Sequence, residues 1–199
     1  MIKNIEILIV NYNTPNLIDK ILKTYKKYKY IEPIHIIDGS DINNKYKKLK
    51  DIIKKHNIKD LKLTHFDYNI HHGPGLHYGI MNSDYDYNLL MDSDSFFKKS
   101  QLFKEISTFD ENTFGIGKIV IVDNKGLNNK KGNIKYLHPN ACIINKEKYL
   151  KSESLKKHGA PFIETMKHMK FKIKENEKIM NYIDTTNNRG TCSIYGYNL

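Results

Sequence analysis

Two carboxylates stand two residues apart, directly after a short apolar run. The run covers residues 87–91, and Asp92 and Asp94 follow it with Ser93 between them. A short apolar run bounded by polar residues predicts a buried parallel strand, and open α/β sheets bind their ligands at the carboxyl ends of such strands. In extended chain both side chains leave on one face, which suits a hard divalent cation that also binds a phosphate. The alternative is an ordinary polar turn, because Asp and Ser both favour turns.

The elements that lead to these carboxylates alternate between strand and helix. Apolar runs predict strands over residues 5–10, 33–37, 61–66 and 87–92. Thr14 before Pro15 predicts the start of a first helix, the spacing of apolar residues from 46 to 53 predicts a second, and a glycine-rich loop over residues 69–79 opens a third. The alternation predicts an α/β fold, with a Rossmann-type, mostly parallel, doubly wound sheet and helices on both faces.

Polar residues follow the carboxyl end of each predicted strand. These residues are Asn11 and Tyr12, Asp38, the 71–79 loop, and the Asp92–Asp94 pair. Right-handed crossovers bring such strand ends to one edge of a sheet, so we expect these groups to meet there. Their convergence favours a binding site over four unrelated turns.

The second half of the chain has a less regular pattern. We expect helices over residues 100–109, 146–157, 162–170 and 174–182, strands over 114–122, 134–137 and 141–144, and a loop over 123–133. With 199 residues and no long linker, the chain is expected to form one domain, residues 1–199. Its two halves would be residues 1–97 and residues 98–199.

The chain is strongly basic, with Lys+Arg 33 against Asp+Glu 22 and a net charge of +11. Such an excess attracts polyanions, but almost all of it is Lys, and Arg189 is the single arginine. Two cysteines do not make a disulfide framework, and no apolar run reaches the length of a membrane span. No signal peptide precedes the first strand, so we expect a cytoplasmic protein without a transmembrane segment.

Four blocks of this sequence resemble the family-two, GT-A-type glycosyltransferases. They are Val10-Asn11-Tyr12-Asn13, Ile37-Asp38-Gly39-Ser40, the 69–79 loop, and Leu90-Met91-Asp92-Ser93-Asp94. The first three are similar to the family's nucleotide-binding blocks, and the last looks like its metal-binding Asp-x-Asp. Each block is short, but the order and the spacing of all four match the family.

The resemblance implies a GT-A-like fold and an inverting transfer of a sugar from a nucleoside diphosphate donor, most simply a UDP-sugar, assisted by Mn²⁺ or Mg²⁺. Tyr12 would lie against the base, Asp38 would accept from the base or ribose, Asp92 would face the ribose and the metal, and Asp94 would hold the metal. The donor-binding set then consists of Val10, Tyr12, Asp38, Gly73, Gly75, His77, Asp92 and Ser93. A cation that neutralises the departing diphosphate lowers the barrier, and N–H groups at a helix start bind phosphate.

The 69–79 loop departs from the family pattern. His71 stands where the family often has Gly, His77 where it often has Asn, and Leu76 where many members have Arg. We interpret the histidines as hydrogen-bonding within the loop, because their spacing fits no closed zinc site and no Cys lies near.

The resemblance makes residues 1–97 the nucleotide-sugar-binding half and residues 98–199 the acceptor-binding half. It also implies that a carboxylate of the second half deprotonates a hydroxyl of a glycan, protein or lipid-linked acceptor. Glu164 follows a Gly-Ala-Pro break and is the first candidate, with Asp184 as the second. The alternative for Glu164 is a helix-start residue that the helix dipole favours. A third metal ligand from Asp184 or Asn188 has no support in the sequence.

Three other functions remain open at this point. A nucleotidyltransferase could share the nucleotide half and the cation, although no Gly-rich loop followed by Lys comes after the first strand. A nucleic-acid-binding module would explain the charge of +11, but the scarcity of Arg and the lack of a basic–aromatic motif oppose it, so no nucleic acid is expected. The altered loop would also suit an inactive glycosyltransferase-like scaffold.

Overall fold

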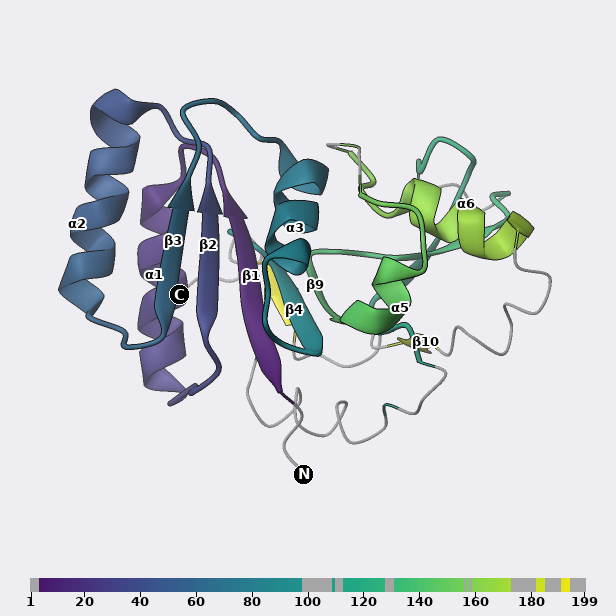
Figure 1. Ribbon diagram of the computed structural model, residues 1–199, viewed down its shortest axis with the longest axis horizontal. Coiled ribbons are helices and arrows are strands. Elements are labelled where there is room, and N and C mark those ends of the chain that lie inside the picture. The colour runs from purple at the N-terminus through teal and green to yellow at the C-terminus, as the bar shows by residue number, and fades with distance from the viewer. Residues whose placement is uncertain are drawn as a thin grey trace.

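The structure is a computed structural model that describes residues 4–97, 109, 113–127, 131–155, 157, 159–172, 182–184 and 191–193. Its centre is a seven-stranded sheet in the order β10-β6-β9-β4-β1-β2-β3 (Figure 1). Neighbours pair in parallel from β4 to β3, and β9 is inserted antiparallel between β4 and β6. The expected mostly parallel, doubly wound α/β sheet is confirmed.

The first half forms the parallel part of the sheet and the helices that cover it. Its elements are β1 (Ile5–Asn11), α1 (Pro15–Lys27), β2 (Ile34–Asp38), the π-helical turn η1 (Ile42–Tyr46), α2 (Lys47–His56), β3 (Leu61–His65), α3 (His72–Met81) and β4 (Tyr87–Asp92). Alternate residues of β1 enter two cores. Ile7 and Ile9 pack with α1 and α2, whereas Leu8 packs with α3. In Figure 1, α1 therefore lies behind the sheet and α3 in front of it.

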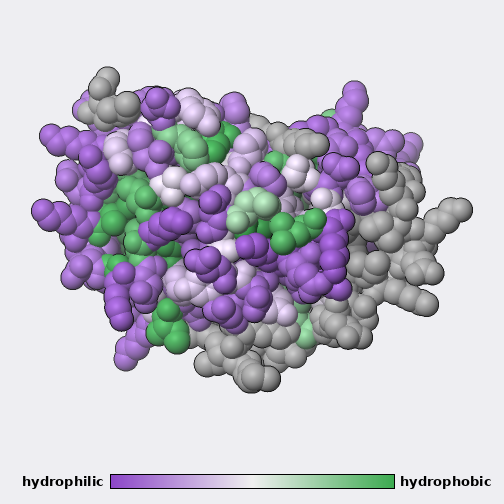
Figure 2. Space-filling view, viewed as in Figure 1, coloured by the Kyte–Doolittle hydropathy of each residue, from purple (hydrophilic) through white to green (hydrophobic). Residues whose placement is uncertain are grey.

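The second half extends the sheet and adds two small ones. Its elements are β5 (Ser95–Phe97), β6 (Gly115–Gly117), β7 (Ile119–Val122), β8 (Ile134–Leu137), β9 (Ala141–Asn145), α5 (Lys146–Leu150), α6 (Ile163–Lys172), β10 (Tyr182–Asp184) and β11 (Thr191–Ser193). β7 and β8 form an antiparallel hairpin, and β5 pairs antiparallel with β11. Among the described residues, no helix is long and apolar enough to cross a membrane. Hydrophilic side chains cover most of the face in Figure 2.

The strand predicted over residues 114–122 is two strands, because the chain leaves the main sheet at Lys118. A Cβ atom on Gly117 would lie 2.6 Å from Cys142 Cβ, so the backbone of β6 lies directly against β9. The Lys118 carbonyl then accepts the His138 N–H at 2.8 Å, which starts the β7–β8 hairpin. The single strand was therefore a wrong prediction.

The helix predicted over residues 146–157 ends at Leu150. The Ser152 N–H and hydroxyl both donate to the Tyr149 carbonyl, which stops the helical ladder after α5. The helix expected near 162–170 is confirmed as α6, whereas those expected over 100–109 and 174–182 lie almost wholly outside the described residues. At the end of the latter range, Tyr182 begins β10 instead.

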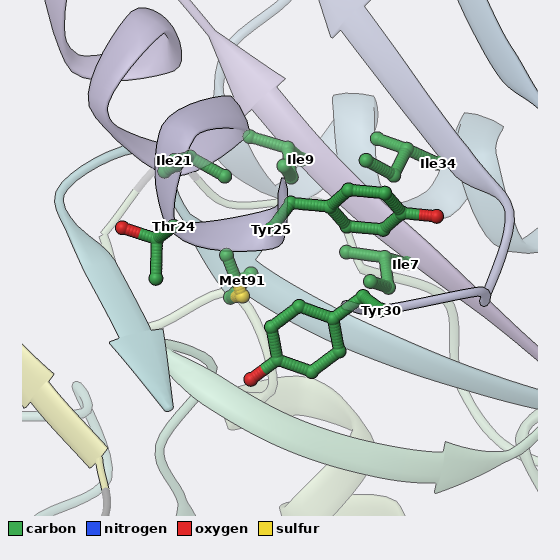
Figure 3. A pocket seen from close by; sticks show the side chains of 8 residues that line it. All are labelled: Ile7, Ile9, Ile21, Thr24, Tyr25, Tyr30, Ile34 and Met91. Carbon is green, nitrogen blue, oxygen red and sulfur yellow. The ribbon is translucent and has the colours of Figure 1, made fainter. Parts of the chain in front are cut away.

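A small cavity of about 20 Å³ lies beneath α1 (Figure 3). Its lining is almost entirely apolar and consists of Ile7, Ile9, Ile21, Thr24, Tyr25, Tyr30, Ile34 and Met91. A cavity of this size admits one water molecule at most, and a water needs polar partners that this lining does not offer. We interpret it as a packing gap between α1 and the sheet.

Candidate active site

A cleft of about 420 Å³ opens beside the carboxyl end of β4. His72 and Asp92 line it from the first half of the chain. The β7–β8 hairpin and two loops line it from the second half, through Lys118, Val120, Val122, Gly126, Tyr136, His138, Pro139, Gly159, Ala160 and Pro161. The cleft thus joins the predicted carboxylate site to the second half.

Close backbone packing holds the loops around this cleft. A Cβ atom on Gly73 would lie 2.1 Å from the Lys157 carbonyl oxygen, so only glycine fits between α3 and the 157–161 loop. Gly126 has a φ of 85°, and a Cβ there would lie 2.3 Å from Ala160 Cβ. Gly159 differs, because a Cβ there would meet nothing within 4 Å.

Asp92 and Asp94 lie at the turn between β4 and β5, and both side chains are half-buried. Asp92 Oδ1 lies 3.0 Å from His72 Nε2, and the Asp92 N–H donates to the Asn140 carbonyl at 2.9 Å. Among the described residues, no group of three or more His, Cys, Asp or Glu side chains could hold a metal ion. Two carboxylates still fit Mg²⁺ or a similar hard ion, because such ions keep several waters and bind substrate phosphates.

Ser93, between the two carboxylates, is tied to the end of β1. Its Oγ lies 3.3 Å from the Thr14 hydroxyl, which donates to Asn11 Oδ1 at 2.6 Å. Thr14 occupies the predicted N-cap position of α1, but its side chain makes no capping bond to the helix. The hydroxyl instead links the ends of β1 and β4, which the local helix-start signal did not indicate.

Asp38 is completely buried and its carboxylate is held from three sides. Oδ1 accepts from Asn11 Nδ2 at 2.7 Å and from Ser40 Oγ at 2.6 Å, and Oδ2 lies 2.8 Å from His65 Nδ1. The Ser40 hydroxyl oxygen accepts the Asn13 N–H at 2.8 Å, which fixes the loop after β1. Asp38 therefore shapes the loop that carries Tyr12, whose side chain is 44% exposed.

The start of α3, which belongs to the glycine-rich 69–79 segment, packs on β1. Gly75 is buried, and a Cβ there would lie 2.9 Å from Val10 Cγ2. His77, which we predicted for donor binding, has its Nδ1 2.6 Å from the Tyr149 hydroxyl. That contact directs the His77 ring toward α5, so the structure lends no support to a donor contact from His77.

His138 is a cleft residue that the sequence reasoning passed over. It ends β8 in the His138-Pro139-Asn140 turn, and its Nδ1 lies 3.1 Å from Asn140 Oδ1 and 3.3 Å from the Asn140 N–H nitrogen. Burial lowers the pKa of His138, although the nearby Asp92 acts in the opposite direction. The signal available in the sequence was a His-Pro-Asn turn between two strand-like runs.

The sequence model of the family described as glycosyl transferase family 2 matches residues 6–176 of the chain. The chain belongs to this family. A search of curated proteins gave no match. The recognised resemblance is thereby confirmed for the greater part of this family 2 chain.

Solved structures support the fold of this family 2 member. It is similar to a mannosyltransferase, PcManGT from Pyrobaculum calidifontis, in complex with GDP-Man and Mn²⁺, with a TM-score of 0.66 and 11% identity over 91% of this chain and 54% of that one. S. aureus TarS 1–349 with UDP-GlcNAc gives a TM-score of 0.57 and 15% identity over 81% of this chain and 53% of that one.

A third similar structure is glucosyl-3-phosphoglycerate synthase from Mycobacterium tuberculosis in complex with UDP. Its TM-score is 0.60 at 8% identity, over 92% of this chain and 70% of that one. At such identities the likeness shows the GT-A-like fold. This family 2 chain spans about half the length of the mannosyltransferase and of the TarS chain named above.

The two carboxylates predicted as bases have different placements. Glu164 is paired with Lys157 Nζ at 2.8 Å and with Lys167 Nζ at 3.3 Å, and the bond from Lys157 is the main cause of its lowered pKa. It is absent from the described residues that line the cleft. Asp184 ends β10 beside Gly117, and its side chain lies outside the described part of the structure.

Proposed function

We propose that this chain transfers a sugar, with inversion, from a nucleoside diphosphate sugar to a hydroxyl of a glycan, protein or lipid-linked acceptor. The observation that carries the proposal is the cleft itself. Asp92 and His72 line it on one side, Asp94 follows Asp92 by two residues, and three segments of the second half form the rest of its wall. The fold neighbours with GDP-Man and UDP-GlcNAc support this class of donor.

In this proposal the first half binds the donor. Tyr12 packs on the base of the nucleotide, which is uracil if the donor is a UDP-sugar. Asp38 supports Tyr12 indirectly by fixing the Asn11–Asn13 loop. A direct bond from Asp38 to the base stays a prediction. Asp92 and Asp94 would hold Mn²⁺ or Mg²⁺, which when bound neutralises charge on the departing diphosphate. The Mn²⁺ of the mannosyltransferase complex supports this choice of ion.

The second half would place the acceptor in the cleft. Tyr136 and Pro139 are buried residues of the cleft lining and would limit the access of water to the sugar. Gly159, whose position is open, belongs to the same lining. The division into a donor half, residues 1–97, and an acceptor half, residues 98–199, therefore stays part of the proposal.

Binding and turnover test the function separately. Isothermal titration with UDP, GDP and CMP, each with and without Mn²⁺, should show one nucleotide whose affinity depends on the ion. Proton NMR of the released sugar from UDP-glucose, UDP-GlcNAc and GDP-mannose should then show the inverted anomer first. Cleavage between the phosphates, or no nucleotide binding at all, would contradict a sugar transfer.

Gly159→Phe tests the cleft as the acceptor site. The backbone of Gly159 lies outside the left-handed region and a Cβ meets nothing, so a ring can enter the cleft without disturbing the fold. We expect unchanged nucleotide binding with slower transfer. Gly159→Ala, which adds only a methyl group, is the matched control.

A further inference from the structure

The His138-Pro139-Asn140 turn is bonded to the backbone of Asp92, whose carboxylate is a predicted metal ligand. The Asn140 carbonyl accepts the Asp92 N–H at 2.9 Å, and both His138 and Asp92 line the cleft. The imidazole of His138 therefore lines the cleft in which the donor sugar would lie. His138 is also half-buried, so its ring is shielded from bulk water without being closed off from the cleft.

The two contacts with Asn140 are compatible with different tautomers of His138. A side-chain amide oxygen only accepts, so a bond from His138 Nδ1 to Asn140 Oδ1, 3.1 Å away, places the proton on Nδ1. The Asn140 N–H lies farther from the same nitrogen, at 3.3 Å, and would favour the opposite tautomer. The tautomer with its proton on Nδ1 leaves Nε2 with a lone pair, and within the described part of the structure no hydrogen bond reaches Nε2.

Burial, together with the charges around the ring, keeps the imidazole neutral at neutral pH. Burial is the largest influence and lowers the pKa of His138, and Lys118 and His72 act in the same direction. Asp92 and the bond to Asn140 raise the pKa, but the net direction is down from 6.5. A neutral imidazole in a shielded cleft is suited to accept a proton.

We propose that His138 is the catalytic base of this enzyme and that Asn140 is the residue that positions it; the inference rests on the proposed glycosyl transfer. His138 Nε2 takes the proton of the acceptor hydroxyl as its oxygen bonds to the anomeric carbon of the donor. The bond from that carbon to the diphosphate breaks, and the diphosphate leaves with the electron pair. The proton on His138 is later released to solvent.

Two other carboxylates, Glu164 and Asp92, suit this step less well. The Glu164 carboxylate is held by two lysines away from the cleft lining, and these lysines stabilise its charged, weakly basic form. Asp92 is assigned to the donor and cation, on the side of the departing diphosphate. An inverting transfer needs its base on the opposite face of the sugar, where the second half of the chain forms the cleft wall.

The first experiment uses water as the acceptor, so no acceptor need be known. Hydrolysis of UDP-glucose, UDP-GlcNAc and GDP-mannose is measured with Mn²⁺ for the native chain and for His138→Gln, with His168→Gln on α6 as the histidine control. We expect His138→Gln to lower turnover about a hundredfold or more. Affinity for the nucleoside diphosphate should be unchanged, and the acid limb of the pH–rate profile should disappear.

Asn140→Asp gives a readout that a structural role would not move. A carboxylate beside Nδ1 stabilises the protonated ring, so the acid limb of kcat/KM should shift to higher pH while turnover above it persists. Asn140→Ala leaves only the backbone N–H beside Nδ1, which favours the inactive tautomer and should lower kcat without changing nucleotide affinity.

The second experiment needs no activity. Long-range proton–nitrogen NMR of the histidine-labelled native chain, with His138→Gln for assignment, should show a proton on Nδ1 and an unprotonated Nε2 at pH 7. A proton on Nε2, or normal turnover of His138→Gln, would overturn the assignment of His138 alone. Failure to bind any nucleoside diphosphate or to cleave any donor would instead contradict the proposed function.

Discussion

His72 Nε2 lies 3.0 Å from Asp92 Oδ1, so the first residue of α3 is held against the last residue of β4. Both side chains are only partly exposed, 21% for His72 and 28% for Asp92. The contact aims the Asp92 carboxylate toward the loop that resembles the family's donor-binding loop. Asp94 follows two residues later, in the turn between β4 and β5, and is half-buried like Asp92.

Asp94→Ala should abolish the Mn²⁺ dependence of nucleoside diphosphate binding without unfolding the protein. Asp94 lies in the turn after β4, so its loss removes a ligand and leaves the strand intact. Titration calorimetry of UDP and GDP with and without Mn²⁺ measures the effect. Asp84→Ala, which removes an exposed carboxylate before β4, is the control. Binding by the Asp94 variant that still depends on Mn²⁺ would remove Asp94 from the site.

Asp38→Ala should destabilise the fold as well as weaken nucleotide binding. The substitution leaves Asn11, Ser40 and His65 without their shared buried acceptor. Losing such a charged network costs about 3 kcal/mol, which for a chain of this size lowers Tm by about 10 °C. Calorimetric melting measures this loss, with Asp41→Ala, an exposed neighbour, as the control. If the variant bound nucleotide more weakly but kept the native Tm, the result would instead support a direct contact between Asp38 and the base.

Gly73→Ala should lower stability by about 1–3 kcal/mol, because the new methyl group meets the Lys157 carbonyl. The same displacement should weaken nucleotide binding, since α3 and the 157–161 loop move apart. Urea unfolding compares it with Gly159→Ala, for which we expect no change because that position is open. Equal effects of the two substitutions would contradict the close packing of these loops.

Glu164→Gln separates the two candidate bases. If Glu164 were the base, turnover would fall about a hundredfold. Because its partners are Lys157 and Lys167, we expect instead a small change in turnover and the retention of the acid limb. Steady-state kinetics of donor hydrolysis over a range of pH decides between them. A large loss confined to turnover would return the role to Glu164.

The stability of the protein should fall between pH 7 and pH 4 because of His35, a buried residue of β2. Burial lowers the pKa of His35 to about 4, and Lys62 adds to the effect. As pH falls, an unfolded chain takes up a proton near pH 6.5 that the folded chain refuses, so unfolding becomes easier. The loss is at most about 3 kcal/mol.

Urea unfolding at a series of pH values measures this loss, with His35→Gln as the comparison. Glutamine keeps a polar group near Thr64 Oγ1, which lies 2.9 Å from His35 Nε2, but it does not titrate. The variant should therefore lose less stability on acidification than the native chain. Parallel pH profiles would show that His35 has no part in it.

The sequence by itself determined the strands and helices of the first half and the edge of the sheet where polar residues gather. These features depend on local patterns: each apolar run that became β1, β2 or β4 is buried at most positions, and the polar residue after each run lies at its carboxyl end. The four family blocks fall within this half, which is why the family could be recognised before any contact was known.

Only the tertiary structure decided which of those polar groups line the cleft and which are held inside the fold. Asp38 turned inward because Asn11, Ser40 and His65 converge on it from different segments, and His77 turned toward Tyr149. The His138-Pro139-Asn140 turn reached Asp92 because β9 enters the sheet antiparallel beside β4, which brings the turn before β9 to the end of that strand. Such contacts join residues that are far apart in the chain, so the local spacing of residues does not reveal which of them will meet.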